Sequence, residues 1–567
     1  MKKLFVFIMT LACTISAMRA QVVTLRNDAF CIDHNKRMAI IGYTDVSDYC
    51  SKGLCIESVI LDDVYTLEKA IDTPQTSQSY KAFDRNGVEY DFFISSIPMI
   101  TINTDAAIVN TPAVHGLITV SNSNYPTITM DMGIKIRGTS SQQYDKKSYR
   151  IELWSDATGT LMMDTTFLGM RSDDDWNLEA MYNQPLRLRD KIGHELWQEM
   201  HPLSYADLEP EAISSIRMEY ADVFINGSYC GVYALTERVD RKQLKLKRFN
   251  GEIRGQLYKG NGDGTPSFTS LPSYNNSSST WDNYEWVYPN ETEAPRDWSL
   301  LYSFVNFVMN SSDNTFYSQY QNLFEVDNAI DYFIFINVLK ATDNMARNTF
   351  VAKYNKSGAY FYVPWDLDAI LGLNSEAMPT SANDLKTNGF FDRLILDCDA
   401  SGFVDMLRQR YNTLRNTLLS KASLMARIEQ TYQDNQAKGI YQREHEAWPE
   451  YNVEESQLDY ISNWLDGRLD YLDMVFNCDC GTWSTDEHET SIIHIYPNPA
   501  TDVVTISTMS DSPITITITD CFGRIVKQKI VCSENVIVNI DDLSDGIYLV
   551  TQNDGTSQRH DKLIIAK

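Results

Sequence analysis

Four side chains with hard oxygen atoms lie within one short segment of the chain: Asp343, Asn348, Asp366 and Asp368. Mg²⁺ takes carboxylate and amide oxygens as ligands and keeps substrate phosphates as its other ligands. Asp343 and Asn348 have the D-x-x-x-x-N spacing of a catalytic loop for phosphoryl transfer, in which the Asp is the base and the Asn binds metal. Asp366 follows the apolar run YFYVP, where a metal-binding carboxylate would sit. A polar surface loop is the alternative interpretation.

A second group of residues, farther upstream, has the composition of a phosphate-binding turn. Small residues, Gly138 and Ser140 among them, separate two strand-like runs, and Lys146 and Lys147 open the second run. Such a turn lets backbone N–H groups approach phosphates, and a lysine on the next strand adds positive charge. Glu195, in the following predicted helix, is a candidate partner for that lysine. Each feature alone is common, whereas the ordered set of turn, Lys, helix Glu, D-x-x-x-x-N and strand Asp is not.

Hydrophobic periodicity indicates the elements that must position these residues. Between residues 93 and 240, apolar and polar residues alternate in several runs, which predicts half-buried strands, and Asn226-Gly227 joins two of them as a hairpin. The run 184–200 and several segments after residue 297 have apolar residues at helical spacing. Residues 93–477 therefore predict an α+β domain, with a sheet-rich half followed by a helix-rich half.

Further regions flank this domain. Residues 21–92 are β-rich and irregular and contain no constellation of catalytic residues. Residues 478–490 are polar, as is typical of a linker. Residues 491–567 contain short strand-like runs at roughly even spacing, which predicts a small all-β sandwich.

The composition is that of a globular protein, with 43% hydrophobic and 22% charged residues. A formal net charge of −27 argues against a broad nucleic-acid-binding surface, because phosphates would be repelled. A local basic pocket for a small phosphate ligand is compatible with this charge. No stretch after the N-terminus reaches ~18 uninterrupted apolar residues, so we expect no transmembrane span in the mature chain.

The N-terminus has the pattern of a secretory signal peptide over residues 1–20. Lys2 and Lys3 precede an apolar run that ends in small residues near Ala20. Cleavage as a lipoprotein before Cys13 is the alternative, and it is disfavoured because Thr10 stands where such a site has Leu. The pattern predicts an exported protein.

The cysteine content predicts disulfide bonds. One of the ten cysteines lies in the predicted signal peptide, so nine remain. In an exported protein some of them should pair, and the odd number leaves at least one unpaired within the chain. Cys50 with Cys55, or either of them with Cys31, are plausible pairs.

Five blocks of the sequence resemble, in the same order, the successive blocks of the CotH kinase family, which is named for a spore coat protein: GIKIRGTSSQQYDKKSYRIEL, WNLEAMYNQPLRLRDKIGHELWQEM, VFINGSYCGVYALTERVD, DYFIFINVLKATDNMARNTFVAK and FYVPWDLDAILG. The resemblance covers residues 93 to 475. It implies an atypical, two-lobed, protein-kinase-like fold that binds ATP and Mg²⁺. It also implies phosphorylation of Ser or Thr in exported proteins.

The resemblance assigns roles to residues of this sequence. The catalytic residue is then Asp343. The metal ligands are Asn348 and Asp366, with Asp368 close by. The phosphate-side cations are Arg137, Lys146 and Lys147. The turn residues Gly138 and Ser140 and the helix residue Glu195, indicated above by the sequence pattern, complete the predicted nucleotide-binding set. Family members usually carry a basic residue directly before the catalytic Asp, and this chain departs from that pattern with Thr342.

The C-terminal region resembles a second family. The motifs YPNPATDVVTI, ITDCFGRIV, DLSDGIYLVT and KLIIAK are similar to those of the type A sorting domain of the type IX secretion system in Bacteroidetes. The resemblance implies passage across the outer membrane by that machinery, usual removal of the tail, and release or attachment at the cell surface. An ordinary adhesive β-sandwich is the alternative.

Two functions are compatible with these patterns. The first is an exported Mg-ATP-dependent protein kinase that transfers the γ-phosphoryl group to Ser or Thr of another exported protein. The second is a catalytically silent surface or matrix protein that uses the same fold for adhesion or assembly. Scarcity of ATP outside the cell favours the second. The combination of acidic residues and lysines favours the first, because a binding module has no need of it.

Overall fold

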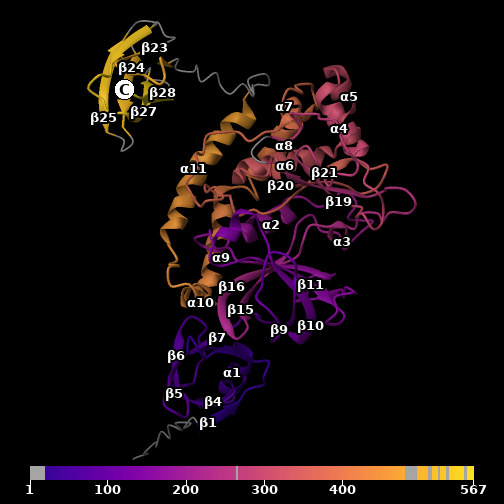
Figure 1. The fold of residues 1–567 in the computed structure, drawn as a ribbon, viewed down its shortest axis with the longest axis vertical. Helices are drawn as coiled ribbons and strands as arrows, with labels where there is room; N and C mark the ends of the chain where they lie inside the picture. The colour runs from indigo at the N-terminus through magenta and orange to yellow at the C-terminus, as the bar shows by residue number, and fades with distance from the viewer. Residues whose placement is uncertain are drawn as a thin grey trace, which may run out of the picture. The chain divides into compact units, whose positions relative to one another are not determined.

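The computed structural model describes residues 19–262, 266–478, 495–507, 514–520, 524–531, 535–553 and 558–567. These residues form two compact units, with the boundary between Asn477 and Cys478 (Figure 1). The predicted signal peptide lies outside the described residues except for its last two, which begin strand β1.

The first unit opens with a seven-stranded sheet in the order β1-β4-β5-β6-β7-β3-β2. Its strands are β1 (Arg19–Thr24), β2 (Phe30–Asp33), β3 (Met38–Gly42), β4 (Leu54–Ile60), β5 (Val64–Ile71), β6 (Ser79–Phe83) and β7 (Glu89–Ser95), and helix α1 (Tyr43–Cys50) connects β3 to β4. Side chains such as Ile56, Tyr65 and Phe92 form its buried core. The β-rich region was predicted to end at residue 92, whereas its last strand continues to Ser95.

A closed barrel follows, with strand order β10-β11-β14-β16-β15-β8-β9. Its strands are β8 (Met99–Thr104), β9 (Val114–Asn122), β10 (Tyr125–Ile136), β11 (Tyr149–Trp154), β14 (Asp175–Glu179), β15 (Met218–Ile225) and β16 (Ser228–Thr236). A short 3-10 helix (Ser140–Gln143) lies between β10 and β11, and the two-residue strands β12 (Thr165–Thr166) and β13 (Ser172–Asp173) form a separate ladder. The predicted Asn226-Gly227 hairpin joins β15 to β16 with φ values of 50° and 77°.

The rest of the first unit is mostly helical. A five-stranded sheet, in the order β18-β19-β17-β20-β21, comprises β17 (Gln256–Asn261), β18 (Thr280–Trp281), β19 (Tyr284–Tyr288), β20 (Arg347–Lys353) and β21 (Tyr360–Pro364). The helices are α2 (Arg189–Met200), α3 (Arg241–Leu244), α4 (Ser299–Asn310), α5 (Asp313–Leu323), α6 (Val326–Leu339), α7 (Gly389–Leu394), α8 (Phe403–Arg415), α9 (Lys421–Ala437), α10 (Ile440–Ala447) and α11 (Ser456–Asn477). Helix α6 is buried from Asn328 to its end and lies against β21 (Figure 1).

The second unit consists of two small sheets around one apolar core. The first contains β22 (Ile495–Tyr496), β23 (Val503–Ser507) and β26 (Asn535–Asn539). The second contains β24 (Ile514–Thr519), β25 (Ile525–Val531), β27 (Gly546–Asn553) and β28 (Gln558–Ile565). The predicted class is therefore confirmed at the coarse level: a mixed α+β chain, sheet-rich and then helical, with a C-terminal β region.

Two local expectations are wrong. The helix predicted over 184–200 begins at Arg189, because Arg187 adopts a φ of 53°, which a right-handed helix does not accommodate. The thiols of Cys31 and Cys50 are free, so neither forms a predicted disulfide. The Cys50 thiol instead donates to the Ile71 carbonyl at 3.6 Å. Cys398 is disulfide-bonded.

Within the part of the chain that the structure describes, no helix has the length and hydropathy of a membrane span.

Candidate active site

One cleft in the first unit is lined by residues from both the barrel and the helical half. Its volume is about 270 Å³. It is bordered by the β10–β11 connection, the turn after β14, the first turn of α2, strand β17 and the segments that adjoin β20 and β21. The predicted residues that line it are Arg137, Gly138, Lys146, Asp343, Asn348, Asp366 and Asp368. Two segments more than 200 residues apart in the sequence, the turn and the acidic loop, therefore meet at one site.

Asn348 and Asp366 share an unusual backbone conformation. Both are left-handed, with φ values of 55° and 53°, which Asn and Asp tolerate better than most other residues. They adjoin the end of the β20–β21 ladder, where the Trp365 N–H donates to the Asn348 carbonyl at 2.9 Å. The buried Asn344 amide donates to the carbonyls of Asn348 at 2.5 Å and Trp365 at 2.8 Å. Asn344 thus ties together the two segments that carry the predicted metal ligands.

The carboxylates of the cleft repel one another. Burial raises the pKa of Asp368 well above its usual value, and the charge of Asp366 adds to this shift. Burial also raises the pKa of Asp343, opposed by Arg347 and assisted by Asp366. Carboxylates that are crowded and desolvated in this way are stabilised by a bound divalent cation. The oxygen donors of Asn348, Asp366 and Asp368 therefore fit Mg²⁺.

The turn between β10 and β11 requires glycine at its first position. Gly138 has a φ of 93°, and a Cβ atom there would lie 1.9 Å from the Ser141 hydroxyl oxygen. The preceding residue, Arg137, pairs with Glu179 and lies 5.7 Å from the centre of the Trp365 ring. Burial lowers the pKa of Arg137, and the charge of Asp366 opposes that shift. The turn therefore carries a cation beside the acidic loop.

Lys146 is held by a different glutamate from the one predicted. Its ammonium is completely buried and contacts both carboxylate oxygens of Glu444, in α10, at 2.7 and 2.9 Å. It also donates to the Val232 carbonyl at 2.6 Å, and the same carboxylate accepts from Arg187 at 3.1 Å. Burial lowers the pKa of Lys146 to about 8, against the charge of Glu444. Lys146 therefore anchors α10 to the barrel beneath the cleft.

Two other predicted residues lie away from the cleft lining. The prediction that Glu195 supports Lys146 is wrong, because the Glu195 carboxylate pairs with Lys191, one turn earlier in the same helix, at 2.7 Å. Lys147 donates to the Gln142 carbonyl at 3.0 Å and to the Tyr144 carbonyl, which closes the β10–β11 turn from beneath. The strand predicted to open with Lys146 and Lys147 begins only at Tyr149, so both lysines belong to the β10–β11 connection. Ser140 belongs to the 3-10 helix of the turn, and its side chain is outside the described part of the structure.

The structure adds two cations to the cleft, Arg347 and Lys259. Arg347 lies four residues after Asp343 and lowers the pKa of that carboxyl, in opposition to burial. Lys259, on β17, lines the cleft, and burial lowers its pKa. The spacing of Arg347 from Asp343 was a usable signal in the sequence. The sequence carried no signal for Lys259, because only the strand order of the five-stranded sheet brings β17 beside β20.

Three polar residues around the acidic loop were also missed. The Asn183 amide donates to Asp368 at 2.7 Å. The Gln184 amide donates at 2.5 Å to Asp190, whose other carboxylate oxygen accepts from the Leu367 N–H at 2.7 Å. All three line the cleft. The sequence carried no signal for them, because Asp190 and Leu367 are 177 residues apart.

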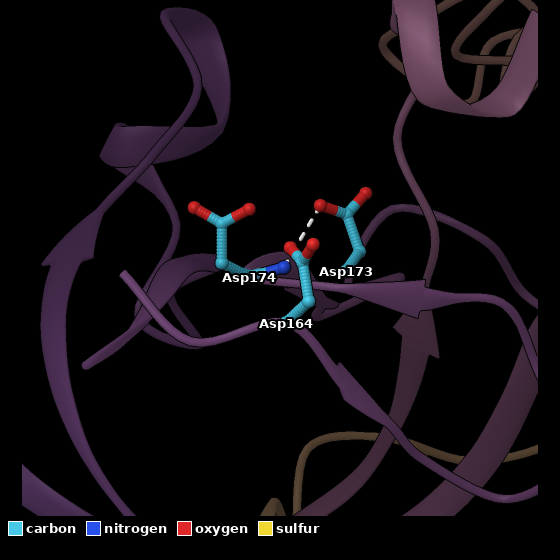
Figure 2. A group of neighbouring side chains, drawn as sticks. All are labelled: Asp164, Asp173 and Asp174. Atoms are coloured by element: carbon cyan, nitrogen blue, oxygen red, sulfur yellow. Dashed lines mark hydrogen bonds between the residues drawn. The ribbon is translucent and has the colours of Figure 1, made fainter. Parts of the chain in front are cut away.

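Figure 2 shows a separate acidic cluster of Asp164, Asp173 and Asp174, none of which lines the cleft. Oxygen atoms of Asp164, Asp173 and Asp174 lie within 4.8 Å of one another, and among the described residues no other His, Cys, Asp or Glu set does so. The Lys242 ammonium contacts all three, at 2.6 Å from Asp164 and 2.8 Å from Asp173. Lys242, together with Arg171, which pairs with Asp173, offsets part of the negative charge of the cluster, and we interpret the cluster as structural.

Comparison with known proteins places this geometry in context. Inner spore coat protein H of Bacillus subtilis (strain 168) is 25% identical over 262 residues, which are 46% of this chain and 64% of that protein. The chain thus covers slightly less than two thirds of that relative. A solved structure of PorZ, described as an essential bacterial surface component of the type-IX secretion system of Porphyromonas gingivalis, aligns at 23% identity over 15% of this chain and 13% of PorZ, with a TM-score of 0.13.

Two families match the chain itself. Residues 494–566 match the secretion system C-terminal sorting domain, which implies export to the cell surface or medium and interaction with the type IX secretion machinery. Residues 134–472 match the family described as CotH kinase protein, beginning inside β10. This second match spans more than half of the 567 residues. The chain belongs to the CotH kinase family and carries a C-terminal sorting domain.

Proposed function

We propose that this chain is an exported protein kinase that transfers the γ-phosphoryl group of ATP to Ser or Thr of another exported protein. One observation carries the proposal. A single cleft holds the potential base Asp343, the oxygen donors Asn348 and Asp366, and the glycine turn at Gly138 with its neighbour Arg137. These are the parts that phosphoryl transfer needs: a base, metal ligands, and donors and cations for the phosphates.

We infer a two-lobed, kinase-like arrangement around this cleft. The barrel supplies the glycine turn, and the helical half with β17 to β21 supplies Asp343 and the acidic loop. The kinase-like domain predicted over 93–477 would then begin directly after β7. Residues 478–490 would link it to the sorting sandwich over 491–567.

Asn348, Asp366 and Asp368 would hold Mg²⁺, which neutralises charge on the ATP phosphates when it is bound. Arg137 and Lys259 offer further positive charge on the walls of the cleft. Backbone N–H groups of the glycine turn can donate to phosphate oxygens, because no side chain stands at Gly138 to block their approach. Lys146 and Glu444 act indirectly, by fixing α10 against the barrel.

Asp343 is suited to accept the proton of the acceptor hydroxyl. Its raised pKa makes its carboxylate a stronger base than an exposed aspartate. As the proton leaves, the hydroxyl oxygen bonds to the γ-phosphorus and the bond to the β-phosphate oxygen breaks, which releases ADP. Arg347 balances the negative charge of Asp343.

Calorimetry of the full chain with Mg·ATP tests the nucleotide site, with Asp366→Asn as the variant and Asp327→Asn, at the first turn of α6, as the matched control. We expect affinity to fall in Asp366→Asn alone, because a neutral amide replaces a carboxylate on a hard cation. Transfer of radiolabelled phosphate to co-exported proteins tests the reaction. A wild type that neither binds Mg·ATP nor transfers phosphate would favour the silent adhesive role.

A further inference from the structure

The first turn of α2 contacts the loop that carries Asp366 and Asp368. Asp190 is buried in this turn, and its two carboxylate oxygens have separate partners. One accepts from the backbone N–H of Leu367 at 2.7 Å, and the other accepts from the Gln184 amide at 2.5 Å. Leu367 is the residue between the two acidic ones, so this bond acts on the backbone of the loop itself.

Two further contacts from the N-terminal half of α2 reach the same loop. The buried Arg189 guanidinium donates through Nε to the Ile370 carbonyl at 3.0 Å. Gly193, one turn later, lies so close to the loop that a Cβ atom would stand 2.8 Å from a methyl group of Leu367 and 3.2 Å from one of Ile370. Three residues at one end of α2 thus fix the backbone from Leu367 to Ile370.

The contact between α2 and the acidic loop stabilises an unusual backbone conformation at Asp366. Asp366 is left-handed, with a φ of 53°, and such a conformation in a residue with a side chain persists when its surroundings enforce it. The Asn348 carbonyl holds the N–H of Trp365 on one side of Asp366, and Asp190 holds the N–H of Leu367 on the other. The direction of the Asp366 side chain is therefore set from both sides.

We propose that Asp190 is a positioning residue, which orients the carboxylates of Asp366 and Asp368 for a divalent cation through the Leu367 N–H. Both of its oxygens already accept from N–H donors, which suits a supporting role rather than direct coordination. The identity of the cation as Mg²⁺ bound with ATP rests on the proposed function. The role of Asp190 in holding the loop is independent of it.

Asp190→Asn tests the proposal in the full chain. The new amide can still accept from Leu367, but its N–H group then faces the Gln184 amide donor. Gln184 cannot simply flip, because its oxygen accepts from the Arg189 N–H at 2.9 Å. In the double variant Gln184→Glu with Asp190→Asn, the new Asn amide can donate to the new Glu carboxylate. The net charge of the pair stays the same as in wild type. Asp327→Asn, the same change in the first turn of α6, is the control.

Two readouts are measured: hydrogen exchange of the peptide that contains Leu367 without added metal, and Mg·ATP affinity by calorimetry. In Asp190→Asn we expect faster exchange and an affinity lower by about 10–100-fold. The double variant should recover both, and the control should match wild type. Wild-type affinity in Asp190→Asn overturns the proposal. So does a double variant that recovers protection without affinity, because Asp190 would then act on the cation directly.

A variant on the other side of the contact covers the case in which Asp190→Asn does not fold. Gly193→Ala pushes a methyl group toward Leu367 and replaces no side chain of the cleft. We expect it to weaken Mg·ATP binding, and unchanged binding would contradict the proposal. If wild type binds no Mg·ATP while exchange still responds to Asp190→Asn and recovers in the double variant, the proposed kinase function fails and the role of Asp190 in holding the loop stands.

Discussion

At the scale of single residues, the buried ion pair of Lys146 and Glu444 is the most demanding feature of the first unit. Both side chains are completely removed from water, which costs several kcal/mol for each ion before any pairing. The cost is offset because Glu444 also accepts from Arg187 and from the Val232 N–H at 2.9 Å. The carboxylate therefore serves three donors from different parts of the chain.

Removal of this carboxylate should destabilise the protein strongly. Glu444→Gln leaves two buried cations without a counter-ion, and we expect the free energy of unfolding to fall by about 3–5 kcal/mol. Chemical denaturation of the two proteins measures the difference. Glu195→Gln is the matched control, because its half-exposed pair with Lys191 contributes only about 0.3–0.5 kcal/mol. Equal losses of unfolding free energy in the two variants would show that the buried pair contributes no more to stability than the surface pair.

Asp343→Asn should separate chemistry from stability. If Asp343 is the base, the nearly isosteric amide should leave the fold and most nucleotide affinity intact and slow transfer by about 10²–10⁴-fold. Asp343 lies in the turn between α6 and β20, and if it served only to stabilise that turn, its loss would cost about 1 kcal/mol of stability and leave transfer unchanged. Phosphate transfer and a melting curve on the same samples distinguish these outcomes, and a mutant with lower stability and full activity would exclude Asp343 as the base.

At the scale of elements, α2 links the two halves of the first unit. Its first turn reaches the acidic loop, and its later residues are buried against the helical half. His194, in the middle of the helix, is buried, and its Nδ1 lies 2.8 Å from the Ser215 hydroxyl. Burial lowers the pKa of His194 to about 3, so the folded protein keeps this ring neutral well into the acid range.

The stability of the fold should therefore depend on His194 below neutral pH. The pKa of His194 is depressed in the folded state. The unfolded chain therefore takes up a proton on this ring near pH 6.5, whereas the folded chain takes it up only near pH 3. As the pH falls through this window, wild type should lose about 1.4 kcal/mol per pH unit more than His194→Asn. Urea unfolding at several pH values measures both slopes. Parallel slopes would show that the ring does not titrate in this way.

At the scale of the whole molecule, the boundary after Asn477 separates two compact units that each have a core. Deletion of residues 491–567 should leave the CotH domain folded, because the apolar clusters formed by the described residues of the first unit contain no residue of the tail. The truncated protein should melt at the temperature of the same domain in the full chain. It should also accumulate in the periplasm, since the sorting domain implies export by the type IX machinery. Cell fractionation checks this, and normal surface delivery would show that the tail is dispensable for sorting.

Features that depend on neighbouring residues were readable from the sequence. The Asn226-Gly227 hairpin, the succession of strands and helices, the spacing of Asp343 and Asn348, and the motifs of the sorting domain all reflect contacts within a few residues. Local backbone preference and hydrophobic period act at that range. The families and the coarse α+β class followed from them.

Only the tertiary structure decided which partners the buried charges take. Lys146 meets Glu444 across 298 residues, where the sequence pointed to the much nearer Glu195, and Asp190 meets Leu367 across 177. Glu195 had the right residue type and a helical context, but its helix turns it toward Lys191. The physical reason is that a buried charge selects the counter-ion that packing brings beside it, and no local spacing reports how distant elements pack.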